Sequence, residues 1–98
     1  MAIYEGIMKL KPEMMSWRQN IHSHPELAFE EFKTSSFVAE KLLEFGIEVH
    51  SGLATTGVVG TLEGKSTGPS IAIRADMDAL ALNEETGLSY ASKIEGRM

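Results

Sequence analysis

Two aspartates separated by one residue, Asp76 and Asp78, are the strongest candidates for chemistry in the sequence. On an extended backbone, side chains at positions i and i+2 point to the same side, so both carboxylates can face one cation or one histidine. Divalent metals take anionic oxygen ligands, and metal-bound histidines are oriented by a carboxylate behind them. A solvated turn after a strand, or an ion pair between Arg74 and Asp76, explains the residues equally well. The local pattern leaves these alternatives open.

A second polar group, His22-Ser-His24-Pro25-Glu26, contains two imidazoles and a carboxylate. Two histidines at i and i+2 can ligate zinc from a strand, but they diverge at the end of a helix. Pro25 also confines the second histidine to a turn. We interpret the group as a helix-terminus cluster, because a protonated histidine is favourable near the carboxyl end of a helix.

The segment from Gly60 to Ser66 partly resembles a phosphate-binding loop. That loop needs a glycine where Val59 stands, and it must open a helix whose backbone N–H groups face the phosphate. Here Gly68-Pro69 leads into an expected strand. The segment is therefore predicted to be a hairpin turn.

The elements that must position these residues are read from hydrophobic spacing. Apolar residues three and four apart predict helices over residues 12–22 and 30–45, the second ending at a Gly46 cap. Pro12 either begins a new helix or kinks one long helix; we favour a new helix, with a looser one before it. Pro25 is expected to end the helix.

Short runs rich in β-branched residues predict three strands, at residues 47–50, 57–62 and 70–74. The connection of about seven residues between the last two is too short for a parallel crossover, so they are expected to be antiparallel. A weaker signal suggests a further strand at residues 90–94. The predicted fold class is α/β, with two N-terminal helices packed on a mixed sheet.

Composition bounds the class of protein. The 98 residues suit one domain or part of one. The 9 Lys and Arg against 14 Asp and Glu leave a net charge of −5, which argues against nucleic acid or an anionic membrane as a partner. No apolar run approaches the roughly 20 residues of a membrane span. The absence of cysteine favours a cytoplasmic location.

Four blocks of the sequence, in order and spacing, resemble the N-terminal part of a family of metal-dependent amidohydrolases. This family includes hippurate hydrolase, the indole-acetyl-amino-acid hydrolases and bacterial N-acyl-amino-acid amidohydrolases, which are relatives of aminoacylase and carboxypeptidase G. The blocks are Arg18-Gln-Asn-Ile-His-Ser-His-Pro-Glu-Leu27, Phe29-Glu-Glu-Phe-Lys-Thr34, Thr56-Gly-Val-Val-Gly-Thr-Leu-Glu-Gly64 and Ile73-Arg-Ala-Asp-Met-Asp-Ala-Leu80.

The resemblance implies a fold and an activity. Residues 1–98 correspond to the N-terminal part of a catalytic α/β sandwich domain, which is incomplete here, and the family's smaller satellite domain is absent from this chain. The family carries two divalent metals (zinc, manganese, cobalt or nickel) that activate a water, with a glutamate as general base. The implied substrate is a small N-acyl amino acid, such as hippurate, whose amide bond is cleaved.

The resemblance also assigns the aspartates. Asp78 matches a carboxylate that, in the wider clan, follows a metal-ligating histidine by two residues, so it is expected to orient a group at the catalytic centre. Asp76 occupies that histidine's position and is its expected catalytic partner. Ala81 departs from the family's usual proline. No substrate-binding residue is assigned.

The family's metal-binding cysteine and histidines follow the sequence Gly-Arg-Met that stands at residues 96–98, so no metal ligand is expected within this chain. The chain alone is therefore expected to be an inactive fragment that holds no metal tightly. The alternative is a non-catalytic folded fragment that forms homo-oligomers through open sheet edges, since an unpaired strand recruits another chain.

Overall fold

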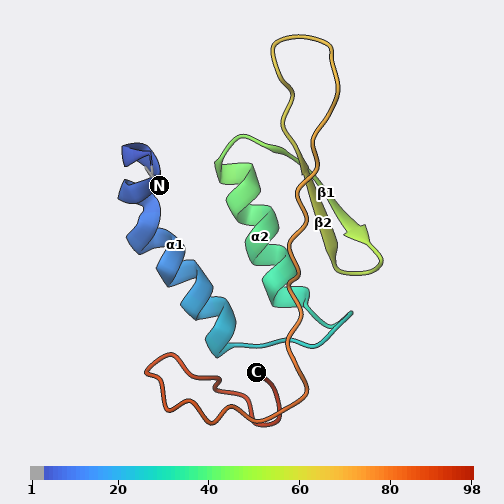
Figure 1. Cartoon of the computed structure of the whole chain (residues 1–98). Helices are drawn as coiled ribbons and strands as arrows, with labels where there is room; N and C mark the ends of the chain where they lie inside the picture. The colour runs from blue at the N-terminus through green and yellow to red at the C-terminus, as the bar shows by residue number, and fades with distance from the viewer. Residues whose placement is uncertain (1–3) are drawn as a thin grey trace. The chain divides into compact units, whose positions relative to one another are not determined.

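The computed structural model describes residues 4–98, and its helices and strands follow one another as α1, α2, β1 and β2 (Figure 1). The elements span Glu5–Ser23 (α1), Phe32–Glu44 (α2), Glu48–Leu53 (β1) and Gly57–Thr61 (β2). The chain divides into two compact units. One comprises residues 4–25 and 80–98, and the other comprises residues 26–79.

Helix α1 is continuous across Pro12, so the prediction of a separate helix beginning there is wrong. Proline removes one backbone donor from the helix ladder, but the residues around it are mostly Met, Lys, Leu and Glu, which favour the helix. The helix ends at Ser23, as Pro25 predicts. His24, which precedes the proline, has left the helical region with φ −126° and ψ 64°.

Helix α2 ends in the glycine cap that the sequence predicts. Gly46 has φ 76°, a left-handed conformation that glycine adopts without a steric penalty. Its N–H donates to the carbonyl of Leu43 at 3.0 Å, and the N–H of Ile47 donates to the carbonyl of Leu42 at 3.0 Å. This pair of bonds is the Schellman motif, which satisfies the last carbonyls of a helix and turns the chain toward β1.

Strands β1 and β2 form an antiparallel hairpin in which Glu48 lies opposite Thr61, with an irregularity between Ser51 and Leu53. The turn holds Ala54 and Thr55 at φ 47° and 77°. Neither is glycine, and a β-branched residue at positive φ is strained. The hairpin therefore needs other contacts to hold this turn.

Helix α2 packs directly on this hairpin, as Figure 1 shows. A Cβ added at Gly60 of β2 would lie 3.1 Å from Leu42 Cδ1 and 3.0 Å from Ile47 Cγ2. Glycine at this position lets the helix approach the strand closely. The predicted helix-on-sheet layer is thus present in the unit formed by residues 26–79.

Residues 70–74 do not form the predicted third strand, and the described sheet has two antiparallel strands rather than a mixed set. The side chains of Ile71 and Ile73 are 93% exposed. Strand propensity alone makes no ladder, and within residues 4–98 no other segment offers a backbone partner to this run. Of the segment before it, Gly60 and Thr61 end β2 and the residues from 62 to 66 form a loop, so the hairpin turn predicted there is absent.

Residues 80–98 form a loop that is closed at its neck. Leu80 and Met98 exchange two backbone hydrogen bonds, of 2.8 and 2.9 Å. The N–H of Lys93 donates to the carbonyl of Ser23 at the end of α1, at 2.9 Å. The strand suggested for residues 90–94 is wrong, because these residues turn instead of pairing.

Within residues 4–98 no large hydrophobic side chain is buried, whereas four polar residues are: Ser23, Glu31, Thr34 and Thr56. Each of these four residues takes part in a hydrogen bond. None of the helices in that part of the chain is both long enough and apolar enough to cross a membrane.

Candidate functional site

Asp76 is engaged by the arginine two residues before it. Arg74 Nη2 lies 2.6 Å from Asp76 Oδ1, and Nη1 lies 3.3 Å from Oδ2. Both side chains are mostly exposed, so the pair contributes at most about 1 kcal/mol to stability. Of the alternatives for Asp76, the structure shows the ion pair.

Asp78 differs from Asp76, because its carboxylate is exposed and has no hydrogen bond or ion pair within residues 4–98. The backbone that follows it is nevertheless held. Ala79 N donates to the carbonyl of Glu26 at 2.8 Å, and Leu80 makes its paired bonds with Met98. An unengaged carboxylate on an anchored backbone is suited to accept a hydrogen bond from a further group.

The side chains of the histidine group turn to separate partners, as the helix-terminus interpretation predicts. His22 Nε2 lies 2.7 Å from Glu84 Oε1. His24 Nδ1 lies 2.9 Å from Ser23 Oγ and 3.0 Å from the carbonyl of Asn20. The two imidazoles therefore do not converge on a common ligand.

Glu26, the last member of that group, caps the start of α2. Its carboxylate accepts the N–H of Lys33 at 3.1 Å, the N–H of Thr34 at 2.7 Å and the hydroxyl of Thr34 at 2.6 Å. Burial raises the pKa of Glu26, but these hydrogen bonds and the charge of Lys33 outweigh it, and the net pKa lies below 4.5. The Glu26 carboxylate therefore satisfies free N–H groups in the first turn of α2, as an N-cap side chain would, although Glu26 lies outside the helix.

Glu31 stands at the N-cap position itself but makes no capping bond with its side chain. Its carboxylate instead accepts the hydroxyl of Thr56 at 2.5 Å, and both residues are buried. The bond from Thr56 is the main reason that the pKa of Glu31 is lowered. Thr56 follows the strained residues Ala54 and Thr55, so this bond holds the hairpin turn against the start of α2.

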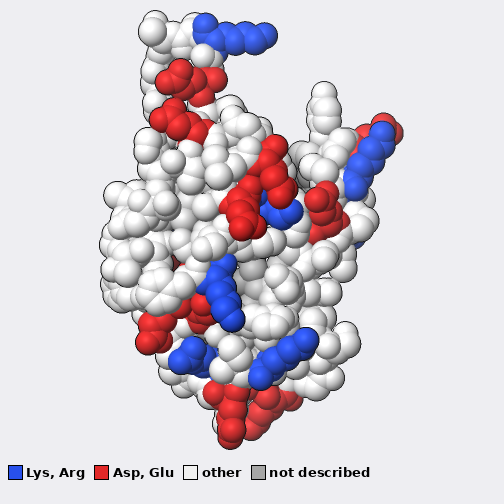
Figure 2. Space-filling view, turned by 180° about the vertical axis from the view of Figure 1, so that it is seen from behind, with Lys and Arg blue, Asp and Glu red and all other residues white. Residues whose placement is uncertain are grey.

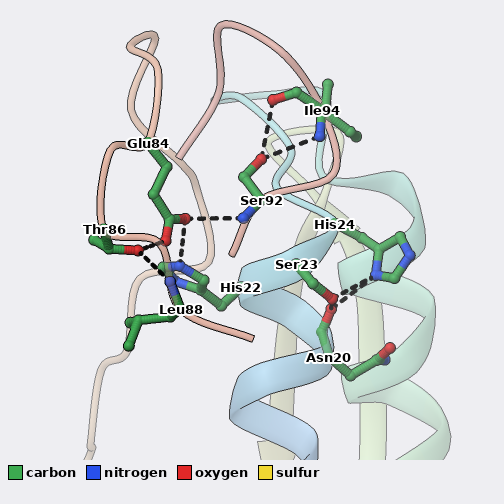
Figure 3. A network of polar contacts seen from close by, with 9 residues as sticks. All are labelled: Asn20, His22, Ser23, His24, Glu84, Thr86, Leu88, Ser92 and Ile94. Atoms are coloured by element: carbon green, nitrogen blue, oxygen red, sulfur yellow. Dashed lines mark hydrogen bonds and ion pairs between the residues drawn. The ribbon is translucent and has the colours of Figure 1, made fainter. Parts of the chain in front are cut away.

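Glu84 is a site residue that sequence reasoning did not find. Its side chain is only 2% exposed, and Figure 3 shows its carboxylate facing His22, Thr86 and Ser92. Oε1 accepts from His22 Nε2 and from Ser92 N at 2.9 Å, and Oε2 accepts from the Thr86 hydroxyl. The hydrogen bonds from Thr86 and Ser92 lower the pKa of Glu84 further than burial raises it, and His22 adds to the lowering. In the sequence, only the Thr86 hydroxyl two residues on distinguishes Glu84 from its exposed neighbour Glu85.

The residues present do not by themselves fit a metal ion. No group of three or more histidine, aspartate or glutamate side chains within residues 4–98 is placed to hold one. Asp76 is paired with Arg74, and Asp78 makes no hydrogen bond or ion pair within residues 4–98.

Acidic and basic side chains are interspersed on the face shown in Figure 2. A nucleic-acid surface gathers lysine and arginine into a continuous patch. On this face the charges therefore favour neither nucleic acid nor an acidic membrane as a partner.

Three curated relatives cover nearly all of the chain. It is 46% identical over 98 residues to the hippurate hydrolase of Campylobacter jejuni, and this alignment covers 100% of the chain and 26% of that protein. It is 45% identical over 93 residues to an N-acetyl-L-cysteine deacetylase of Bacillus subtilis, over 95% of the chain and 22% of that protein. It is 44% identical over 90 residues to an N-acyl-L-amino acid amidohydrolase of Geobacillus stearothermophilus, over 92% of the chain and 24% of that protein. The chain thus spans about a quarter of the length of these relatives.

Two solved structures are also similar to nearly the whole of this chain. A Bacillus subtilis protein described as a dinuclear metal-binding peptidase of the M20 family superposes with a TM-score of 0.87 at 39% identity, covering 93% of this chain and 26% of that chain. A protein from methicillin-resistant Staphylococcus aureus gives a TM-score of 0.90 at 37% identity, over 96% and 25% of the two chains. No family model matches the chain. On the strength of these relatives and structures, the chain belongs to the M20 family of amidohydrolases and peptidases, matching the N-terminal part of their peptidase domain.

Proposed function

We propose that the protein hydrolyses the amide bond of N-acyl amino acids such as hippurate, with this chain supplying the N-terminal part of the catalytic domain. The observation that carries the proposal is the 46% identity to a hippurate hydrolase over the whole chain. In the reaction, the oxygen of water bonds to the acyl carbon and the carbon–nitrogen bond breaks. The nitrogen gains a proton, which releases a carboxylate and an amino acid.

Within this chain, we assign Asp78 an orienting role and Asp76 a supporting one. Asp78 presents an unengaged carboxylate on an anchored backbone, so it can accept a hydrogen bond from a side chain at the catalytic centre and fix its orientation. Asp76 keeps Arg74 beside the same segment. Neither residue is proposed as a metal ligand.

Residues 1–98 alone are proposed to be inactive and to bind zinc, manganese, cobalt or nickel weakly. The related peptidase is described as dinuclear, whereas the described residues of this chain include no group of three or more histidine, aspartate or glutamate side chains placed to hold a metal. The expected result is no turnover of hippurate by the purified chain with added zinc or manganese. Turnover above the rate with metal alone would refute this part of the proposal.

A hybrid enzyme tests the activity itself. Residues 1–98 replace the matched quarter of the Campylobacter jejuni hippurate hydrolase, where the alignment covers the whole chain. The hybrid is expected to hydrolyse hippurate, and Asp78→Asn is expected to lower its kcat by about tenfold to a hundredfold, the range for groups that orient catalytic residues. Glu85→Gln serves as the matched control, because the Glu85 carboxylate is exposed and has no hydrogen bond or ion pair within residues 4–98.

Different outcomes test the substrate class and the role of Asp78. A folded hybrid that lacks hippurate turnover would contradict the substrate class. A hybrid whose Asp78→Asn variant keeps the kcat of the Glu85→Gln control would contradict the role of Asp78 while leaving the activity in place.

Self-association is a second candidate, favoured by the exposure of the apolar run at residues 70–74. Ile71 and Ile73 are 93% exposed, and among the described residues each hairpin strand has one edge without a neighbouring strand. We propose that two copies of the isolated chain pair along this run. Light scattering is expected to give a dimer for the wild-type chain and a monomer for Ile73→Lys. A wild-type monomer at every concentration tested would exclude it.

A further inference from the structure

Glu84 is the centre of a polar network that joins the loop of residues 80–98 to the end of α1 (Figure 3). Its three donors come from two places, namely His22 on α1 and Thr86 and Ser92 in the loop. A carboxylate that is 2% exposed and accepts three hydrogen bonds is costly to remove, because each donor would be left without a partner.

The same network fixes His22. An ionised carboxylate can only accept, so His22 Nε2 must carry the proton that it donates at 2.7 Å. The rings of His22 and Tyr90 pack in a T-shaped arrangement with centroids 5.7 Å apart, and the guanidinium of Arg18 lies 5.3 Å from the centre of the Tyr90 ring. Glu84 and Tyr90 thus hold the loop to two successive turns of α1.

Further hydrogen bonds connect the surroundings of Glu84 to the neck of the loop, where Leu80 and Met98 pair. Asn83, next to Glu84, accepts the N–H of Gly96 on its side-chain oxygen at 2.6 Å. Two residues beyond Gly96, Met98 makes its paired bonds with Leu80. Leu80 follows Asp78 by two residues, so a closed neck restrains the backbone that carries the Asp78 carboxylate.

We propose that Glu84 is a positioning residue: by clasping residues 80–98 to α1 through His22 and Ser92, it fixes the Leu80–Met98 neck and thereby the placement of Asp78. The role of Asp78 rests on the proposed function, whereas the hydrogen-bonded link between residues 80–98 and α1, which we call the clasp, does not. In this role Glu84 acts only through its hydrogen-bond partners.

Amide hydrogen exchange of the 98-residue chain tests the clasp. Glu84→Ala is expected to speed exchange at Leu80, Ser92 and Met98 by about tenfold or more, since it removes every acceptor at the centre of the network. Glu85→Ala is the matched control and is expected to change exchange by less than about twofold. Nitrogen NMR of His22 is expected to show the Nε2–H form in the control and a mixture of tautomers in Glu84→Ala.

Unchanged exchange at Leu80 and Met98 in Glu84→Ala would overturn the proposal. If that variant loses the circular dichroism of α1, Thr86→Val is measured instead. It keeps the carboxylate but removes one donor, and the same amides are expected to exchange faster by a smaller factor. Unchanged exchange in Thr86→Val then overturns the proposal.

Kinetics of the hippurate hydrolase hybrid separate positioning from stability. Glu84→Ala is expected to lower kcat about tenfold with KM nearly unchanged, because a displaced Asp78 affects the reacting centre more than substrate binding. Glu84→Gln is expected to restore kcat, since its oxygen can accept from His22 and Ser92 while its amide donates to Thr86. An undiminished kcat in Glu84→Ala would overturn the positioning role. Loss of all turnover in the unsubstituted hybrid would instead refute the proposed function and leave the exchange result standing.

Discussion

Replacing Glu26 with alanine should destabilise α2 through its first turn. The carboxylate accepts the N–H groups of Lys33 and Thr34 and the hydroxyl of Thr34, which is 5% exposed. Loss of a helix cap costs about 1 kcal/mol. Leaving a buried hydroxyl without a partner adds a similar amount. We therefore expect Glu26→Ala to lower the free energy of opening α2 by about 1.5–2 kcal/mol.

Hydrogen exchange measures this free energy at individual amides. A loss of that size corresponds to exchange that is about ten to thirty times faster, since each 1.4 kcal/mol is a factor of ten. The effect should extend along Phe32–Glu44, which the capped turn initiates, and into the hairpin that packs on it. Glu26→Gln should lose less, because its side-chain oxygen still accepts from Thr34.

Glu40→Gln is the matched control, because Glu40 lies exposed on the same helix and has no hydrogen bond or ion pair within the described residues. Its exchange should stay within about twofold of the wild type. The reasoning fails if Glu26→Ala exchanges no faster than Glu40→Gln. It fails equally if α1 loses as much protection as α2, since that would indicate general unfolding rather than loss of a cap.

Three further predictions can be checked on the same chain. Because hydrogen bonding lowers the pKa of Glu26 below 4.5, its stabilising effect is complete above pH 4.5 and is lost as the pH falls through the lowered pKa. Amide exchange in α2, measured during an acid titration, should show this loss of protection. In Glu26→Gln the protection should depend less on pH. Thr55→Gly should stabilise the hairpin by about 1 kcal/mol by relieving its positive φ, whereas Thr61→Gly, a control in β2, should destabilise it in urea titrations. Arg74→Ala should change stability in the same titrations by less than about 1 kcal/mol, and a larger loss would show that the exposed pair with Asp76 has a structural role.

The sequence predicts those features that depend on neighbouring residues. The Gly46 cap, the end of α1 before Pro25 and the hairpin strands all follow from local chemistry, and the structure contains each of them. The third strand was predicted from equally good propensity and is absent, because a strand requires a partner that no local pattern supplies.

The candidate site shows the same division. The spacing of Asp76 and Asp78 is visible in the sequence, and so is the divergence of His22 and His24. The partner of His22 is not, because Glu84 lies 62 residues further along the chain and reads as an ordinary loop residue. A long-range hydrogen bond leaves only a weak signal in the sequence, such as Thr86 two positions after Glu84.

Ser23, Glu31, Thr34 and Thr56 are buried within residues 4–98 and are hydrogen-bonded, so these four polar positions should tolerate few substitutions. In most globular domains, changes of volume at aliphatic positions are the most damaging. A saturation library should also select strongly against any loss of a hydroxyl or carboxylate at the four buried positions. Near-isosteric exchanges such as Thr-to-Val would be among the least accepted, because they preserve shape and remove only the donor.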